Sequence, residues 1–187
     1  YEYNHITYNH LGDFYCPNCG FKRAELKYAV NEIYDLSPDS SCVRINNLDI
    51  TISQSGTYNI YNALCAFSIA KELNINEEYI KKSLENQSSS FGRQETIKIE
   101  NKEVRIILVK NPAGYNQALE TLCLNKASFD AAFLLNDNYA DGTDISWIWD
   151  VDFEKLKDLN MDTILISGIR AYDMAVRLKI AGLNTDN

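Results

Sequence analysis

The sequence has no excess of basic residues and no long apolar run. Asp and Glu number 26 against 18 Lys and Arg, giving a net charge of -8. The basic face on which nucleic-acid binding depends is therefore not expected, and the acidity is interpreted as a source of solubility. No apolar stretch approaches the ~20 residues of a membrane-spanning helix, so no transmembrane segment is predicted. There is no signal peptide, and Tyr1 is not a natural first residue, so we expect a fragment of a larger enzyme.

Cysteine is the next informative residue type. Five cysteines, an odd number, are spread over predicted helices, a predicted strand and one CxxC, which is a poor basis for disulfides and indicates a reducing cytosol. Hydrophobic residues make up 45% and charged residues 24%, as in globular proteins. A length of 187 residues allows one core plus part of another.

The first half of the chain predicts a hairpin followed by two helices. Residues 1–24 contain the CxxC and no predicted element, and alternation over 26–30 predicts a strand. Runs at 43–45 and 48–52 flank Asn46-Asn47, which suits a tight hairpin turn. A helix is expected after Gly56, and a second one after an Asn76 cap.

The polar stretch 86–90 predicts a boundary between a domain ending at 88 and a second one covering 89–187. Beyond it strands and helices alternate, which predicts an α/β fold with a parallel, doubly wound sheet. The expected strands are 96–100, 104–109, 131–135 and 163–166, the last two buried, and the expected helices are 118–124, 154–159 and 170–180.

The CxxC motif is Cys16-Pro17-Asn18-Cys19-Gly20. Two thiolates at this spacing, with Pro and Gly to turn the backbone, form one knuckle of a zinc ribbon. A structural zinc needs four ligands, so the other two are expected before Tyr1. The alternative is a chance pair of free thiols.

Two further motifs carry candidate binding residues. Asn59 and Asn62 lie three apart at the predicted start of the helix after Gly56, where capping and a surface amide are the simpler interpretation. Arg93 stands in the segment 91–95, Phe-Gly-Arg-Gln-Glu. Its guanidinium suits a phosphate, although most such Arg–Glu pairs are surface ion pairs.

Two connections follow predicted strand ends, where ligands bind in open α/β sheets. The first is 110–117, which is otherwise an ordinary Pro-Gly turn. The second is 136–152, with five aspartates and two tryptophans in a loop far longer than such a connection requires. A solvated acidic loop with buried indoles and a functional loop are both open interpretations.

Taken in order, these motifs resemble the Mur ligase superfamily. The stretch from Gly56 through Asn59 and Asn62 is similar to the end of its central ATPase domain, and 91–95 is similar to the Gly-Arg-x-Glu that opens its C-terminal domain. The knuckle and the loop 136–152 resemble the MurT subunits of lipid II isoglutaminyl synthases, whose central domain carries a four-cysteine zinc ribbon.

The resemblance implies a reaction and its cofactors. ATP, with Mg²⁺, would phosphorylate the α-carboxyl of D-glutamate in the lipid II stem peptide, and ammonia from a GatD-type glutaminase partner would give D-isoglutamine. Asn59 would contact adenine, Arg93 would face the phosphates, and Cys16 and Cys19 would bind Zn²⁺. Asp141, or next Asp144, would complete the partner's Cys–His pair.

This sequence also departs from the family. It has no Gly-rich phosphate loop with its Lys, no magnesium ligands and no second CxxC, so the chain alone is expected to be inactive. Ile107 and Lys110 stand where other Mur ligases have an aspartate and a histidine. The alternatives are a relative of folylpolyglutamate synthase, which the knuckle disfavours, and a non-enzymatic zinc-ribbon interaction module, which the nucleotide-facing residues disfavour.

Overall fold

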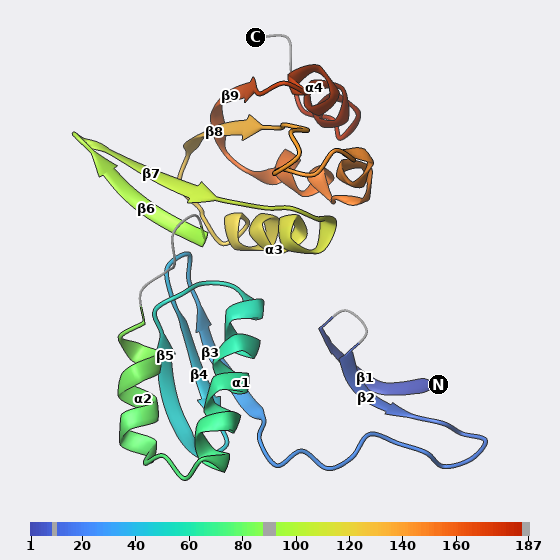
Figure 1. The fold of residues 1–187 in the computed structure, drawn as a ribbon, viewed down its shortest axis with the longest axis vertical. Helices are drawn as coiled ribbons and strands as arrows, with labels where there is room; N and C mark the ends of the chain where they lie inside the picture. Colours follow the sequence, from blue (N-terminus) through green and yellow to red (C-terminus); the bar gives the residue numbers. More distant parts are fainter. Residues whose placement is uncertain (9–10, 88–92, 185–187) are drawn as a thin grey trace.

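The structure is a computed structural model that describes residues 1–8, 11–87 and 93–184. It contains two packed units, one on either side of residues 88–92 (Figure 1). Each unit has its own hydrophobic cluster. The domain boundary expected at residue 88 stays a prediction.

The chain begins with a hairpin that the sequence analysis missed. β1 (Glu2–Tyr8) and β2 (Leu11–Tyr15) pair antiparallel with two register shifts, and the CxxC follows directly. The side chains are mostly exposed polar and aromatic groups, so no apolar alternation revealed these strands. Residues 1–24 therefore hold an ordered hairpin and not the CxxC alone.

The first unit is a three-stranded antiparallel sheet packed against two helices. Its strands are ordered β3 (Val30–Leu36), β4 (Ser41–Ile45) and β5 (Leu48–Ile52), and its helices are α1 (Thr57–Glu72) and α2 (Glu77–Glu85). The predicted β4–β5 hairpin and both helices are confirmed.

Asn46 explains both a success and an error in this unit. Its φ of 50° turns the β4–β5 hairpin, as an Asn can. Its side chain accepts a hydrogen bond from the Ala29 N–H at 2.9 Å and donates one to the Lys27 carbonyl at 3.0 Å. That segment is thus held by a side chain and not by a strand, so the strand expected at 26–30 was wrong: β3 starts at Val30.

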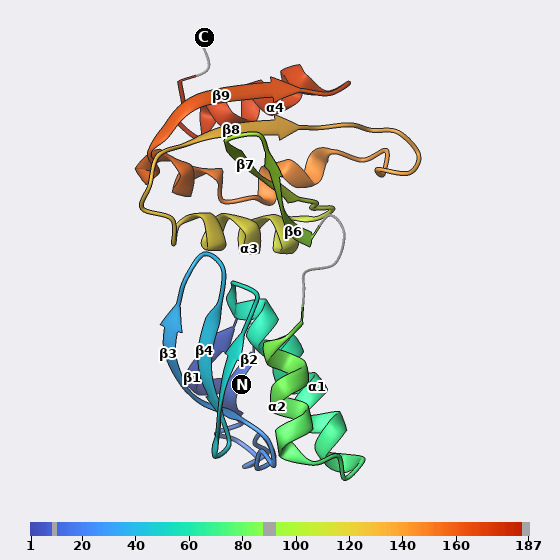
Figure 2. The same ribbon diagram turned by 90° about the vertical axis from the view of Figure 1, so that its left-hand side faces the viewer.

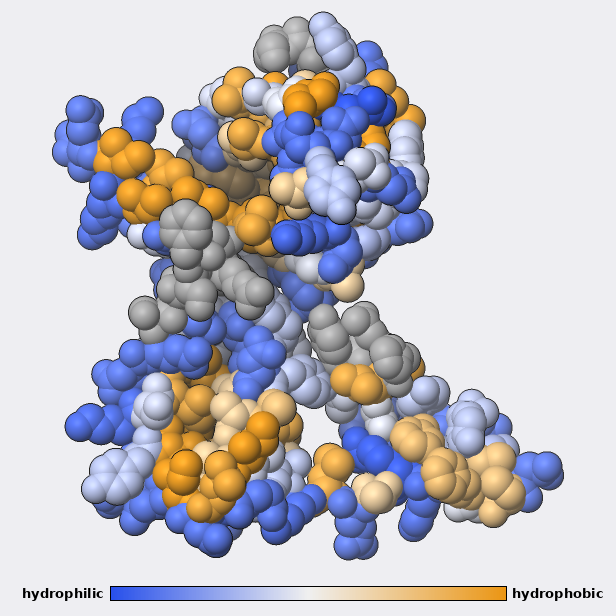
Figure 3. All heavy atoms as spheres, viewed as in Figure 1, coloured by the Kyte–Doolittle hydropathy of each residue, from blue (hydrophilic) through white to orange (hydrophobic). Residues whose placement is uncertain are grey.

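The second unit opens with a projecting hairpin. β6 (Arg93–Ile99) and β7 (Lys102–Ile107) pair antiparallel, with the turn at Glu100-Asn101. The strands expected at 96–100 and 104–109 are therefore present, but both begin and end earlier than expected. Apolar side chains gather along this arm on the surface shown in Figure 3, and Ile99 and Ile106 are 55% and 43% exposed.

A helix begins inside the segment 110–117, which the sequence left open as a ligand-binding connection or a Pro-Gly turn. α3 (Pro112–Leu122) starts six residues before the expected 118. Asn111 accepts the Gly114 N–H at 2.8 Å as the cap, and Pro112 occupies the first turn, where its missing N–H costs nothing. The segment 110–117 is therefore a helix start, not a Pro-Gly turn.

The rest of the unit is a parallel strand pair with a long crossover. β8 (Phe129–Leu134) pairs parallel with β9 (Met161–Ser167), and two 3₁₀ turns lie between them, η1 (Ser146–Asp150) and η2 (Phe153–Asp158). The helix α4 (Ala171–Ile180) follows and ends before Gly182, as predicted.

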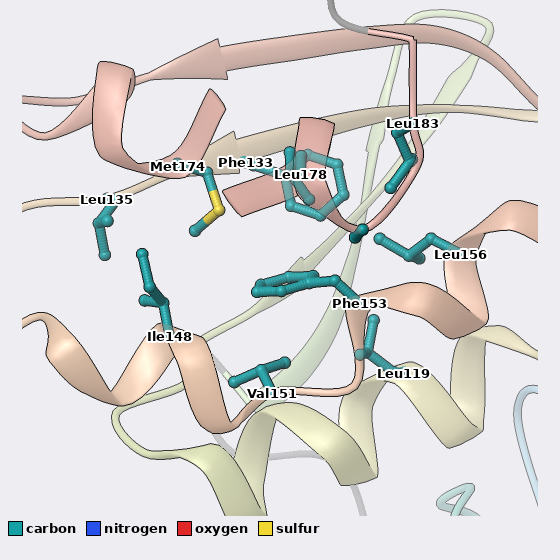
Figure 4. Packing of buried hydrophobic residues seen from close by; sticks show 11 residues of the cluster. Leu119, Phe133, Leu135, Ile148, Val151, Phe153, Leu156, Met174, Leu178 and Leu183 are labelled. Atoms are coloured by element: carbon teal, nitrogen blue, oxygen red, sulfur yellow. The ribbon is translucent and has the colours of Figure 1, made fainter. Parts of the chain in front are cut away.

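The core of the second unit lies on one face of β8 and β9. Phe153 points into its centre, below Phe133 of β8 and Leu178 of α4 and above Val151 in the view of Figure 4. On the other face Leu134 and Leu165 are 66% and 60% exposed, so the expectation that both strands are buried was wrong. A mixed α/β fold is confirmed, whereas the doubly wound sheet stays a prediction because the described residues contain one parallel pair.

Candidate functional site

A cleft of about 740 Å³ lies between the two units. Its walls come from the loop before β4, the end of β5, one side of α1, the β6–β7 hairpin and the start of α3, which face one another across the molecule in Figure 2. Polar side chains of both units line it, among them Asp39, Asn59, Asn62, Arg105 and Gln117. This combination of concave shape and converging polar groups is typical of a small-molecule site.

Asn59 and Asn62 lie at the cleft wall on the first turns of α1. Asn59 is 7% exposed, and its Nδ2 donates to the Ser55 carbonyl at 2.7 Å. Asn62 Nδ2 donates to Asn59 Oδ1 at 3.3 Å. Neither residue caps the helix, since the N-cap is Gly56 without a side-chain bond. The capping interpretation of this motif is therefore excluded, and the pair presents an ordered amide surface to the cleft.

Gly56 allows the two units to approach closely beside this pair. Its φ is 95°, and a Cβ at this position would lie 2.9 Å from the Thr121 Oγ1 of α3. Thr121 is 2% exposed. The glycine is therefore required both by its backbone conformation and by the helix that packs over it.

Arg105 forms a polar contact between the units. Its Nη1 donates to the Pro38 carbonyl at 3.0 Å, and its Nη2 pairs with the Asp39 carboxylate. The contact joins the β7 strand of the second unit to the β3–β4 loop of the first. Nothing in the sequence identified Arg105, because it lies among other alternating residues of a strand.

Arg93 begins β6, and its backbone pairs with Ile107, which lines the cleft. The side chain of Arg93 and the preceding Phe91 and Gly92 lie outside the described residues. The predicted phosphate contact of Arg93 therefore stays a prediction.

The CxxC forms a tight turn after β2. The Gly20 N–H donates to the Cys16 carbonyl at 2.9 Å, and Gly20 has a φ of 76°. The backbone N–H groups of Cys19 and then Asn18 donate to the Cys16 sulfur and lower the pKa of this thiol. A sulfur that already accepts N–H groups is prepared to act as a thiolate ligand, which fits half of a zinc site. Among the described residues, no third His, Cys, Asp or Glu joins these two thiols.

The loop between β8 and η1 holds the candidate acidic residues on the surface. Asp141 is exposed and accepts a hydrogen bond from Asn138 Nδ2 at 3.1 Å. Asp144 is also exposed, and it accepts the Ser146 N–H at 2.8 Å. Hydrogen bonds from the Ser146 side chain and then its backbone lower the pKa of Asp144. Both carboxylates are exposed, and neither lines the cleft.

Arg177 of α4 fixes the following part of this loop from inside. Its Nε donates to the Ile148 carbonyl at 3.2 Å and its Nη2 to the Val151 carbonyl at 2.6 Å. Its Nη1 and Nη2 donate to the two carboxylate oxygens of Glu154 at 3.0 and 3.1 Å. Arg177 follows Met174 by three residues and precedes Leu178, so its spacing places it on the core-facing side of α4. This spacing indicated a buried arginine, and the sequence analysis did not use it.

The two indoles of the loop have different environments. Trp147 is half-buried, and its ring lies 6.2 Å from that of Tyr115 at the edge of the core. Trp149 is 49% exposed, with the Arg177 guanidinium 5.6 Å from its ring. The sequence left burial and surface presentation open for both indoles. Trp147 packs against the core, whereas Trp149 lies at the surface.

Comparison with known proteins identifies the family. A family model described as MurT ligase C-terminal matches residues 108–187. The lipid II isoglutaminyl synthase (glutamine-hydrolyzing) subunit MurT of Streptococcus pneumoniae is 41% identical over 181 residues, 97% of this chain. Residues 108–187 belong to the MurT ligase C-terminal family. The MurT subunit of Staphylococcus aureus is 40% identical over 96% of this chain. The chain spans about 40% of the length of these curated MurT relatives.

Solved structures show which fold the chain shares. A pseudomurein peptide ligase type C from Methanothermus fervidus has a TM-score of 0.63 and 22% identity, covering 100% of this chain and 38% of that one. A folylpolyglutamate synthase from Thermotoga maritima has a TM-score of 0.54 and 15% identity, covering 80% of this chain and 36% of that one. Both indicate a Mur ligase fold, and neither distinguishes substrates.

The structure brings some of the expected MurT site residues together and separates others. Asn59 and Ile107 both line the cleft, and the backbone of Ile107 pairs with that of Arg93. The CxxC and the loop aspartates do not line it, so the predicted metal and partner contacts lie at two other places. No helix among the described residues is long and apolar enough to span a membrane.

Proposed function

We propose that this chain is part of an ATP-dependent ligase subunit that converts the D-glutamate of lipid II to D-isoglutamine for peptidoglycan synthesis in the cytoplasm. The observation that carries the proposal is the 41% identity to a lipid II isoglutaminyl synthase subunit over 97% of the chain. The Mur ligase fold supports a ligase but leaves the substrate open, because a folylpolyglutamate synthase shares it.

The proposed reaction joins ammonia to a carboxyl group. ATP, with Mg²⁺, transfers its γ-phosphoryl group to the α-carboxylate of D-glutamate. Ammonia then attacks the acyl carbon, phosphate leaves, and an amide remains. In this chain Asn59, at the cleft wall, would bind the adenine, and Arg93, at the start of β6, would face the phosphates.

The nucleotide part of the proposal has a direct test. The chain has no Gly-rich phosphate loop, so it should hydrolyse no ATP and bind it weakly. Calorimetry with the 187-residue chain measures the affinity. Micromolar affinity for ATP would show that the phosphates are held by residues other than those proposed.

The ammonia would come from a separate glutaminase of the GatD type, which the loop 136–152 would contact. A carboxylate completes a Cys–His pair by accepting a hydrogen bond from the imidazole. Asp141 and Asp144 are exposed and outside the cleft, so a partner can reach them. Trp149, half exposed beside them in the chain, offers an apolar contact of the kind that anchors interfaces.

The partner contact is tested in the intact subunit with its glutaminase. Asp141→Asn should sharply reduce glutamine-dependent amidation but spare amidation supplied with an ammonium salt, because only ammonia production needs the carboxylate. Stability should change little, since the residue is exposed. Asp150→Asn, an exposed aspartate of the same loop, is the matched control. Full glutaminase activity in both Asp141→Asn and Asp144→Asn would exclude the loop as the donor.

The CxxC would provide two of four ligands to a structural Zn²⁺. The support is the donor set itself, two thiols in a tight turn with backbone N–H groups directed at the Cys16 sulfur. Its place beside the β1–β2 hairpin and away from the cleft favours a structural role over a catalytic one.

A further inference from the structure

One buried polar atom of the cleft has no partner among the described residues. Gln117 is 8% exposed and belongs to the α3 wall of the cleft. Its Nε2 donates to Glu120 Oε2 at 3.2 Å, whereas its Oε1 is buried without a hydrogen bond. Buried acceptors are nearly always paired in proteins, and exceptions concentrate where a ligand or an ion completes them.

The orientation of this amide is fixed by its neighbours. Glu120 is a carboxylate that only accepts hydrogen bonds, and Lys155 Nζ lies 3.7 Å from its Oε1. Exchanging the two ends of the Gln117 amide would place two acceptor oxygens against each other. The unpartnered atom is therefore the oxygen, which can receive only a donor.

The opposite wall supplies the complementary groups. Asn59 and Asn62 present their amides from α1, and Thr121, one turn after Gln117 on α3, packs directly on Gly56 at the start of that helix. Gln117 therefore lies on the helix face that approaches the asparagine pair. A flat polar group between the walls would meet amide groups of both units.

We propose that Gln117 Oε1 accepts a hydrogen bond from a donor group of the nucleoside bound in this cleft. The inference rests on the proposed function, which places a nucleotide here. The donor is either the exocyclic amino group of adenine or a ribose hydroxyl, and in both cases Gln117 selects nucleosides that carry it. The residue thereby adds a specificity contact from the second unit to the asparagine contacts of the first.

The test is an NMR titration of the chain with adenosine, inosine and the 2′- and 3′-deoxyadenosines. Gln117→Met keeps the volume of the side chain and removes the acceptor. Loss of one hydrogen bond should weaken adenosine binding about ten-fold. If the amino group is the donor, the preference for adenosine over inosine should disappear in the variant. If a hydroxyl is the donor, the preference over one deoxyadenosine should disappear instead.

Two controls separate this contact from folding. Lys82→Met also replaces a polar side chain by methionine, at an exposed position of α2 outside the cleft, and should leave binding unchanged. Gln117→Met should melt no lower than the parent chain, because it removes an unsatisfied buried acceptor. Unchanged binding of all four nucleosides in Gln117→Met overturns the inference alone. No binding of adenosine by the parent chain overturns the nucleotide site and the inference together.

Discussion

Arg177 is expected to be the residue on which the long crossover most depends. In Arg177→Met the carbonyls of Ile148 and Val151 lose the guanidinium and keep one backbone donor each, the Val151 N–H at 3.4 Å and the Phe153 N–H at 2.9 Å. Glu154, whose side chain is 52% exposed, returns to water at little cost. A hydrogen bond that involves a charged group contributes about 1.5–3 kcal/mol, so loss of the two bonds to these carbonyls should cost about 3 kcal/mol. This is a large part of the ~5–15 kcal/mol that stabilises a domain.

The two tryptophans make this loss directly measurable. Both lie in the crossover, at 147 and 149, so intrinsic fluorescence in a urea titration reports on this region. Arg44→Met is the matched control, because Arg44 makes an exposed two-point ion pair with Asp49 that is worth about 1 kcal/mol or less. The reasoning is refuted if Arg177→Met lowers the free energy of unfolding no more than Arg44→Met does.

Three further outcomes follow from the same structure. Gly56→Ala should lower the melting temperature more than Gly142→Ala does. Both glycines have positive φ (95° and 93°), but only at Gly56 would a Cβ lie against Thr121. Equal losses of melting temperature would contradict the close approach of α3. The hydrogen bond from Arg177 lowers the pKa of Glu154. The stability that the Glu154 carboxylate contributes should therefore be present above pH about 4.3 and be lost as the pH falls through the lower folded-state pKa. If Glu154→Gln leaves the loss of stability at acidic pH unchanged, this expectation is wrong. The chain should hold well under one zinc per molecule by metal analysis, since two thiolates do not close a tetrahedral site, and full occupancy without chain pairing would refute the half-site.

Local chemistry made much of the fold predictable. Asn76 accepts the Glu78 N–H at 2.9 Å and begins α2, as its position in the sequence indicated. Gly182, with a φ of 90°, follows the last turn of α4. In both cases the signal and the structure it causes lie within a few residues of each other, so the sequence alone contains the argument.

The errors have the opposite origin. The β1–β2 hairpin has irregular register and little burial, so it left no alternating pattern. α3 was missed at its start because Pro and Gly also signal turns, and only the Asn111 cap distinguishes the two outcomes. β8 and β9 are apolar on both faces, yet only one face is covered by the described residues, which periodicity does not reveal.

The candidate site was predictable only where its residues belong to a local motif. Asn59 was identified from its motif, and Gln117 lies in the segment 110–117, which the sequence indicated as a possible ligand-binding connection. Arg105 was not identified, because it contacts Asp39, 66 positions away, only through the docking of the two units. Sequence motifs therefore indicated segments on both sides of the cleft, but not the long-range contact that joins them.

The loop 136–152, within the crossover between β8 and β9, is better explained by a function than by the need to connect two strands. A link between adjacent parallel strands needs a dozen or so residues, usually as one helix. Here it contains an exposed acidic segment followed by η1 and η2, which a buried guanidinium fastens to α4. Burying an arginine is costly unless its hydrogen bonds are satisfied, and here they are satisfied by the loop itself. These contacts hold the part of the crossover that follows Asp141 and Asp144, and both carboxylates are exposed and hydrogen-bonded within the loop. A partner can recognise carboxylates held in this way at a lower entropic cost than those of a flexible loop.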